Sequence, residues 1–291
     1  MTVRHREVDG VTLGAASLLA LMIVAALIVP LAAHTDPLAI GDLLALKLLP
    51  PLTRDAGGAF HLLGTDRFGR DLFVRMMLAA RVSLAIGIGG SVLAAALGTA
   101  VGALSAWWGG ALDRFAMAVT DALLAIPRLV LLLVCAALWQ PGILTVLVVL
   151  VATGWMGVAR LMRGEVQLVR ALPYVQAASA IGVRDRRVLW RHVLPNALGP
   201  AIVATTLGVG NAILLESGLS FLGLGIQPPR PSWGNMIAGG RDLIVTAPWV
   251  ALAPGVALIL TVLAATLLGD RLRDAMAGER SPGARALAER A

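Results

Sequence analysis

The sequence predicts an all-α polytopic membrane protein with six transmembrane helices. Hydrophobic residues make up 58% of the 291 residues, charged residues only 14%, and the mean hydropathy is +0.84. This is more apolar surface than the core of one water-soluble domain can bury. The apolar residues also occur in six runs, most near the ~20 residues that a helix needs to cross a bilayer. Runs this uniformly apolar do not fit the alternating strands of a membrane barrel.

The predicted spans cover residues 11–33, 82–106, 115–139, 143–159, 198–221 and 246–268, and the last five form a core over about 80–270. The first span follows two arginines, as a signal peptide does, but it is longer than a normal signal-peptide core. We therefore interpret it as a retained span.

The distribution of arginine predicts the orientation of the spans. Segment 160–197 contains seven arginines, and basic residues concentrate in cytoplasmic loops. Both termini (1–10 and 269–291) are therefore predicted to be cytoplasmic, and the loops 34–81 and 222–245 extracytoplasmic.

The long first loop is predicted to contain an interfacial helix. Thr65 or Asp66 can cap it, and its apolar positions fall on one face: Leu72, Phe73, Met76, Met77 and Ala80. Trp233 and Trp249 are predicted to be anchors at the membrane interface.

Glycines within the spans predict close helix contacts. Gly98 and Gly102 are four residues apart, and further small positions follow in the fourth and fifth spans: Gly154, Gly157, Gly208 and Gly210. Small residues allow helix backbones to approach one another in lipid.

Several catalytic motifs are missing from the sequence. Lys47 is the only lysine and does not follow a glycine-rich loop, so the chain cannot hydrolyse ATP by a P-loop mechanism. The four histidines are scattered, and the single cysteine, Cys135, excludes an intramolecular disulfide and a cysteine-rich metal site. We expect neither an enzyme nor a bound cofactor or metal. The net charge of +7 is better explained by membrane loops than by nucleic acid.

Three ionisable residues lie within spans, where charge is costly and marks a pathway or a pair: Asp121, Arg128 and Glu216. Asp121 and Arg128 are two helical turns apart, which allows a mutual or cross-helix ion pair, or an Arg128 that faces a substrate. Glu216 lies near the outer end of its span and is predicted to reach the interface. All three are candidates for a translocation path.

The loop 160–197 has the pattern of two short helices. Pro173 suits a first helical turn, small residues follow at 176–180, and Gly182 ends the helix. A polar turn at 184–187 begins the second helix, and Leu194 and Pro195 lead into the fifth span.

This loop resembles the Glu-Ala-Ala loop of ATP-binding-cassette (ABC) importer permeases. Gln176-Ala177-Ala178 is followed by Gly182 and, twelve residues later, by Leu194-Pro195. Segments 63–71 (LGTDRFGRD), 219–225 (LSFLGLG), 231–236 (PSWGNM) and 268–274 (LGDRLRD) are similar to C-type permeases of the oligopeptide/dipeptide/nickel group. The resemblance covers residues 60–275. Gln176 and His192 replace the family's usual glutamate and isoleucine.

The resemblance implies a type I importer permease in the bacterial inner membrane. Its partners would be a B-type permease, two cytoplasmic ATPase subunits that bind ATP and Mg²⁺, an extracytoplasmic binding protein that delivers peptide, and membrane lipid. The loop would dock on an ATPase through these residues: Gln176, Ala177, Ala178, Gly182, Arg184, Asp185, Leu194 and Pro195. Small residues permit a close, rigid contact, and a bulky residue at Ala178 is expected to abolish transport.

Two alternatives remain at this point. An ion-coupled secondary transporter is compatible with six spans and buried charges, but the sequence has no inverted repeat. Within the importer class, nickel or glutathione could replace peptide as the cargo.

Overall fold

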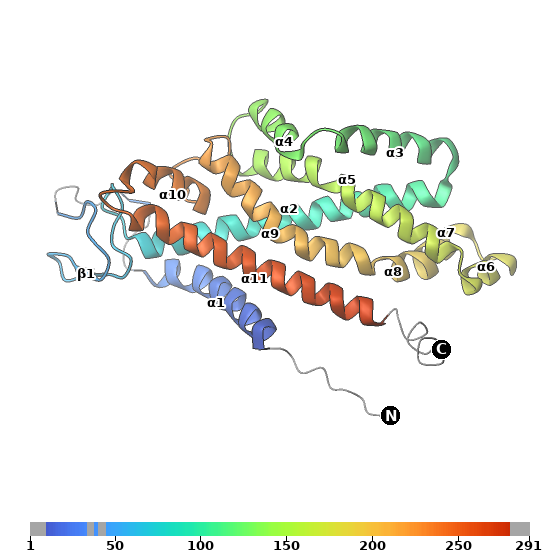
Figure 1. Ribbon diagram of the computed structural model, residues 1–291, viewed down its shortest axis with the longest axis horizontal. Helices are drawn as coiled ribbons and strands as arrows, with labels where there is room; N and C mark the ends of the chain where they lie inside the picture. Colours follow the sequence, from blue (N-terminus) through green and yellow to red (C-terminus); the bar gives the residue numbers. More distant parts are fainter. Residues whose placement is uncertain (1–9, 34–37, 40–44, 280–291) are drawn as a thin grey trace, which may run out of the picture. The chain divides into compact units, whose positions relative to one another are not determined.

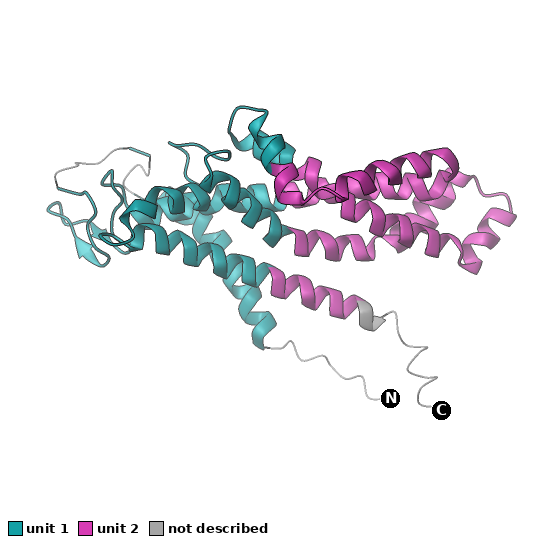
Figure 2. Cartoon of the chain, turned by 45° about the horizontal axis from the view of Figure 1, so that its top comes forward, with its two compact units in different colours: residues 1–89, 133–149, 209–265 teal, residues 90–132, 150–208, 266–291 magenta. Residues whose placement is uncertain are grey.

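The computed structural model describes residues 10–33, 38–39 and 45–279, and side chains up to residue 276 (Figure 1). The predicted N-terminal segment before residue 10, parts of the first loop and the tail from residue 280 lie outside the described residues. The chain forms two compact units, 1–89 with 133–149 and 209–265, and 90–132 with 150–208 and 266–291 (Figure 2). Helices α2, α4, α5, α9 and α11 contribute residues to both units.

Five described helices are long and apolar enough to cross a membrane. They are α1 (Gly10–Ala32), α2 (Leu72–Trp108), α5 (Ile143–Arg170), α9 (Gly199–Phe221) and α11 (Trp249–Glu279). A sixth span results if the bent pair α3 (Gly110–Leu124) and α4 (Arg128–Ala137) is counted as one. The predicted all-α fold with six apolar segments agrees with this arrangement.

Where the sequence predicts one span over 115–139, α3 and α4 meet at an angle of 91°. Pro127 occupies the break and α4 begins directly after it. Proline lacks an N–H and its ring clashes with the preceding turn, so a helix commonly breaks there.

The remaining described elements are short. Strands β1 (Thr53–Arg54) and β2 (Phe60–His61) pair antiparallel. The connection from α5 to α9 contains α6 (Pro173–Ala180), α7 (Asp185–Val188), the π-helix η1 (Leu189–Val193) and α8 (Leu194–Ala197). Between α9 and α11 lie α10 (Trp233–Gly240) and the 3₁₀ helix η2 (Arg241–Leu243).

The predicted interfacial helix is the first part of α2, which begins at Leu72. Its cap is Asp71, whose Oδ1 accepts the backbone N–H of Val74 at 2.9 Å. The prediction of Thr65 or Asp66 as the cap is wrong, because the Asp66 carboxylate accepts the N–H groups of the preceding turn instead. The apolar face of this segment is buried in the core of the first unit, together with residues of α1, α9, α10 and α11.

The two tryptophans predicted as interface anchors both contact protein. Trp233 has 0% exposed surface, so its assignment as an anchor is wrong. Trp249 is half-buried, and its indole N–H donates to the Thr65 carbonyl at 3.5 Å. Trp233 is the first residue of α10, whose N-terminus has a capping box formed by Ser232 and Asn235, and it belongs to the core cluster of the first unit.

Helices α2 and α5 are in backbone contact within the second unit, at the glycines that the sequence singled out. A Cβ on Gly98 would overlap the Trp155 carbonyl, and one on Gly102 would overlap the Ala159 carbonyl. Gly208 meets the Ser91 side chain, whereas Gly157 faces open space. The predicted close packing is therefore confirmed for Gly98, Gly102 and Gly208 but not for Gly157.

We expect Gly102→Ala to destabilise the protein by about 1–3 kcal/mol, because the added methyl group must push two backbones apart. Gly157→Ala is the matched control, since it adds the same methyl group to a helix without a clash and gains about 0.5–1 kcal/mol in helix propensity. The midpoint of thermal unfolding in detergent measures the stability change of both variants. Equal midpoints for the two variants would contradict the contact.

Candidate functional site

Helix α6 has clear local start and stop signals. Leu172 is extended, and Pro173 occupies the first helical turn, where its missing N–H costs nothing. Gly182 follows the helix with φ of +82°, a left-handed conformation that favours glycine. The next N–H, of Val183, donates to the Ala178 carbonyl at 3.2 Å. These residues fix both ends of α6, as the sequence predicts.

One side of α6 is anchored and the other is uncovered. Val175 is 1% exposed and belongs to a core cluster with Val188 and Val193. Another side of α6 carries residues at spacings of three, four and seven, which place them on one helix face: Tyr174, Ala177, Ala178 and Ile181, the last of which directly follows the helix. We call these four residues the α6 face.

The α6 face is apolar and exposed. Tyr174 is 45% and Ile181 81% exposed, Ala177 is exposed and Ala178 is half-buried. Two large apolar side chains and two small ones therefore form one exposed apolar surface along α6 and Ile181, the residue that follows it. An exposed apolar surface of this kind is typical of a site that binds another protein.

Gln176 lies beside the α6 face rather than on it. Its side-chain amide donates to the Ala171 carbonyl at 3.2 Å, and it lines a hollow with Trp107 and Trp108. The same hollow is lined by Arg170, which donates to the Trp107 carbonyl at 2.9 Å and stacks over its ring at 5.0 Å. Gln176 therefore makes this hydrogen bond through a neutral amide, so the contact does not require the charge of the family's usual glutamate.

The other predicted loop residues lie in the following turns. Arg184 precedes α7, and Asp185 is its first residue; both are exposed. Leu194 is half-buried against the same core cluster as Val175, whereas Pro195 is exposed. Leu194 has a packing role in this chain, and the other three residues are free to contact a partner.

Asp121 and Arg128 do not pair with each other. The bend between α3 and α4 separates them, so the expectation that they share one helix face is wrong. Asp121 forms a cross-helix ion pair with Arg160 of α5 at 3.0 Å, and both side chains are more than half exposed. Arg128 is half-buried beside Gly154, and no carboxylate lies within 4 Å of its guanidinium group among the described residues.

Glu216 of α9 has 0% exposed surface, so the expectation that it reaches the interface is wrong. Three serine hydroxyls donate to its carboxylate, Ser83 at 2.9 Å, Ser217 at 3.3 Å and Ser220 at 2.7 Å. No basic side chain of the described residues lies within 4 Å of the carboxylate. Hydrogen bonds from residues of the first unit therefore satisfy the buried Glu216 carboxylate, and no contact with a cargo is needed to explain its burial.

The same serines hold two loop segments. The Ser220 hydroxyl accepts the N–H of Ile226 at 3.0 Å, and the Ser83 hydroxyl accepts that of Trp233 at 3.3 Å. The chain from α9 to α10 is thus attached to Glu216 through serines. Sequence reasoning missed Ser83, whose only signal was a hydroxyl among the apolar residues of a span.

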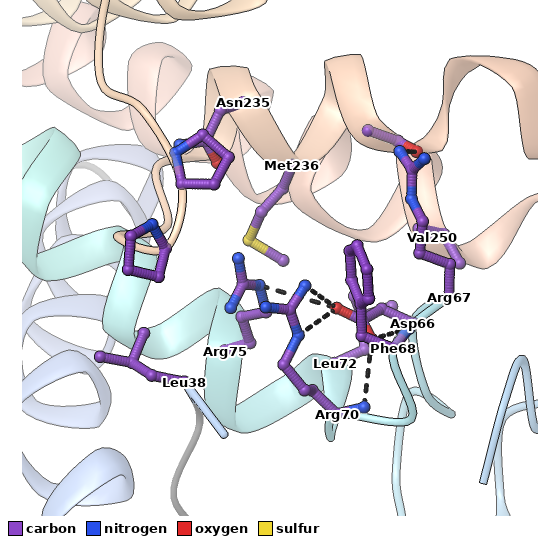
Figure 3. A pocket seen from close by; sticks show the side chains of 13 residues that line it. Leu38, Asp66, Arg67, Phe68, Arg70, Leu72, Arg75, Asn235, Met236 and Val250 are labelled. Carbon is purple, nitrogen blue, oxygen red and sulfur yellow. Dashed lines mark hydrogen bonds and ion pairs between the residues drawn. The ribbon is translucent and has the colours of Figure 1, made fainter. Parts of the chain in front are cut away.

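A hollow of about 550 Å³ lies beside the first turns of α2 (Figure 3). The Asp66 carboxylate accepts from Arg70 at 2.7 Å, and Arg75 approaches the same oxygen at 3.8 Å. Arg67 donates to the Gly239 carbonyl and Phe68 stacks against Arg70 at 4.5 Å. These contacts join the 63–71 motif to α10, which gives that motif a structural role in the first unit.

The fold matches solved importer structures. A chain of the inward-facing MetNI methionine ABC transporter aligns with a TM-score of 0.56 at 19% identity, over 70% of this chain and 95% of that one. A second crystal form of the same transporter aligns with a TM-score of 0.54 at 20% identity. The architecture is therefore that of a type I ABC importer permease.

Sequence comparison identifies the family. Residues 98–278 match the family of binding-protein-dependent transport system inner membrane components, and the chain belongs to this family. It is a permease subunit of an ABC importer in the inner membrane.

Three relatives carry more specific names. The glutathione transport system permease protein GsiD of Pectobacterium atrosepticum is 39% identical over 74% of this chain and 72% of its own length. The dipeptide transport system permease protein DppC of Alkalihalophilus pseudofirmus is 38% identical over 75% of this chain and 72% of its own length. The oligopeptide transport system permease protein OppC of Bacillus subtilis is 37% identical over 74% of this chain and 71% of its own length.

Proposed function

We propose that this chain is the C-type permease of a peptide importer and that the α6 face is its contact with a cytoplasmic ATPase. The observation that carries the proposal is the α6 face itself, an exposed apolar surface on a helix that Val175 anchors to a core cluster. Relatives named for dipeptide and oligopeptide transport support a peptide cargo.

The partners follow from the importer class. A B-type permease would complete the path, two ATPase subunits would bind ATP and Mg²⁺, and an extracytoplasmic binding protein would deliver the peptide. This chain supplies no nucleotide site of its own. With the arginine-rich connection 160–197 in the cytoplasm, both termini lie in the cytoplasm as well.

Arg128 is the strongest candidate for contact with cargo among the three ionisable residues of the spans. Asp121 has an ion-pair partner and Glu216 has hydroxyl donors, whereas Arg128 has no carboxylate within reach in the described chain. A guanidinium group binds a carboxylate in a fork-like geometry, and every peptide ends in a carboxylate.

Purification from native membranes followed by reconstitution into vesicles tests the proposal. We expect a B-type permease and ATPase subunits to co-purify, and uptake of peptide to require ATP and the binding protein. Uptake driven by an ion gradient without an ATPase would overturn the importer mechanism. ATP-driven uptake of nickel or glutathione, with no uptake of peptides, would overturn the peptide cargo alone.

A further inference from the structure

A second surface of the connection between α5 and α9 is strongly basic. Six residues line a surface hollow of about 560 Å³ over α7, η1 and α8, and all six are exposed: Arg184, Arg186, Arg187, Trp190, Arg191 and Pro195. We call this hollow the arginine groove. It is distinct from the α6 face.

The positive charge of the arginine groove is not neutralised within the described chain. No carboxylate there lies within 4 Å of any of its four guanidinium groups. Asp185, the acid nearest in sequence, lines the other hollow beside Trp107 and Gln176. Four exposed guanidinium groups without a carboxylate partner favour an anionic ligand.

The groove also contains an exposed tryptophan among its arginines. Val188 and Val193 are fully buried on its inner side, while Trp190 is 59% exposed on its outer side. The groove is therefore on the outward side of this segment, since Val188 and Val193 belong to a core cluster of the protein, and an exposed tryptophan beside basic side chains is typical of the bilayer interface.

The distance to the membrane is short. Span α9 begins at Gly199, eight residues after Arg191, which is at most about 12 Å of helix. The headgroup layer adds several Å to each side of the hydrocarbon core, and long arginine side chains extend towards it. The groove is therefore within reach of lipid phosphates.

We propose that the arginine groove binds the headgroup of an anionic phospholipid from the cytoplasmic leaflet. The exposed Trp190 and the nearby start of a span favour lipid over an acidic protein surface. Guanidinium groups form paired hydrogen bonds with phosphate oxygens, and several together select an anionic lipid over a zwitterionic one. This inference uses the cytoplasmic orientation of the proposed function but not its cargo.

The test compares lipids bound to the purified importer complex. The delipidated complex is titrated with phosphatidylglycerol or phosphatidylcholine, without nucleotide or peptide, and retained lipid is counted by native mass spectrometry. We expect preferential retention of phosphatidylglycerol by the wild type. The double variant Arg187→Gln/Arg191→Gln is expected to weaken that retention about 10- to 30-fold.

The matched control is Arg114→Gln/Arg273→Gln, which removes the same charge from exposed positions outside the groove. It is expected to retain lipid as the wild type does. Equal loss in both double variants, or no loss in the groove variant, would overturn the proposal. Loss of the ATPase subunits from the groove variant with phosphatidylglycerol still bound would assign the groove to the ATPase instead. Because the assay needs no transport, a failed uptake experiment leaves this result unaffected.

Discussion

Replacing Ala177 by tryptophan is expected to lower ATP-driven uptake about 10- to 100-fold. The side chain at this position is exposed in the middle of the α6 face, between Tyr174 and Ile181. An indole there protrudes from the α6 face and holds the partner surface away, at a cost of about 1–3 kcal/mol in docking free energy. Uptake into reconstituted vesicles measures the effect.

Ala177 is a sharper test position than Ala178. Ala178 is half-buried, so a bulky group there would also disturb this chain, whereas Ala177 leaves the core cluster around Val175 untouched. Ala177→Ser, which remains small, is expected to transport normally. Ala111→Trp places the same indole on an exposed position of α3 and controls for insertion and folding. Full uptake by Ala177→Trp would refute the role of the α6 face.

Much of the fold could be predicted because lipid imposes strict rules on the sequence. The apolar runs, the glycine pair at residues 98 and 102 and the Pro–Gly limits of α6 each follow from local physical requirements. The helical loop 160–197 was recognised for the same reason, since charge and small residues there contrast with the spans.

Features that depend on long-range contacts could not be predicted. Pro127 lies at the break in the predicted span 115–139, but a proline alone does not fix the angle of 91° between α3 and α4. Trp233 resembled an interface anchor, but it is buried in a core cluster with residues of α1, α2, α9 and α11 that lie far from it in the chain. Asp66 does not cap α2, because its carboxylate accepts N–H groups of the turn before the helix. Asp71 is the cap instead.

Replacing Glu216 by alanine is expected to destabilise the protein by about 3–5 kcal/mol. The Ser83 and Ser220 hydroxyls lose their acceptor in a site with no exposed surface, and a cavity remains. The midpoint of thermal unfolding should fall by roughly 5–15 °C. Glu216→Gln keeps the shape but turns an acceptor into a donor, so a smaller loss of about 1–2 kcal/mol is expected.

A local measurement separates this effect from general destabilisation. The N–H groups of Ile226 and Trp233 donate to the serines that Glu216 orients, so their hydrogen exchange should accelerate in both variants. The amide of Val193, in the other core cluster, should exchange as in the wild type. Asp242→Asn, which changes an exposed acid within η2, should alter neither quantity. Unchanged exchange at Ile226 and Trp233 in Glu216→Ala would show that the 219–236 segment is held without the carboxylate.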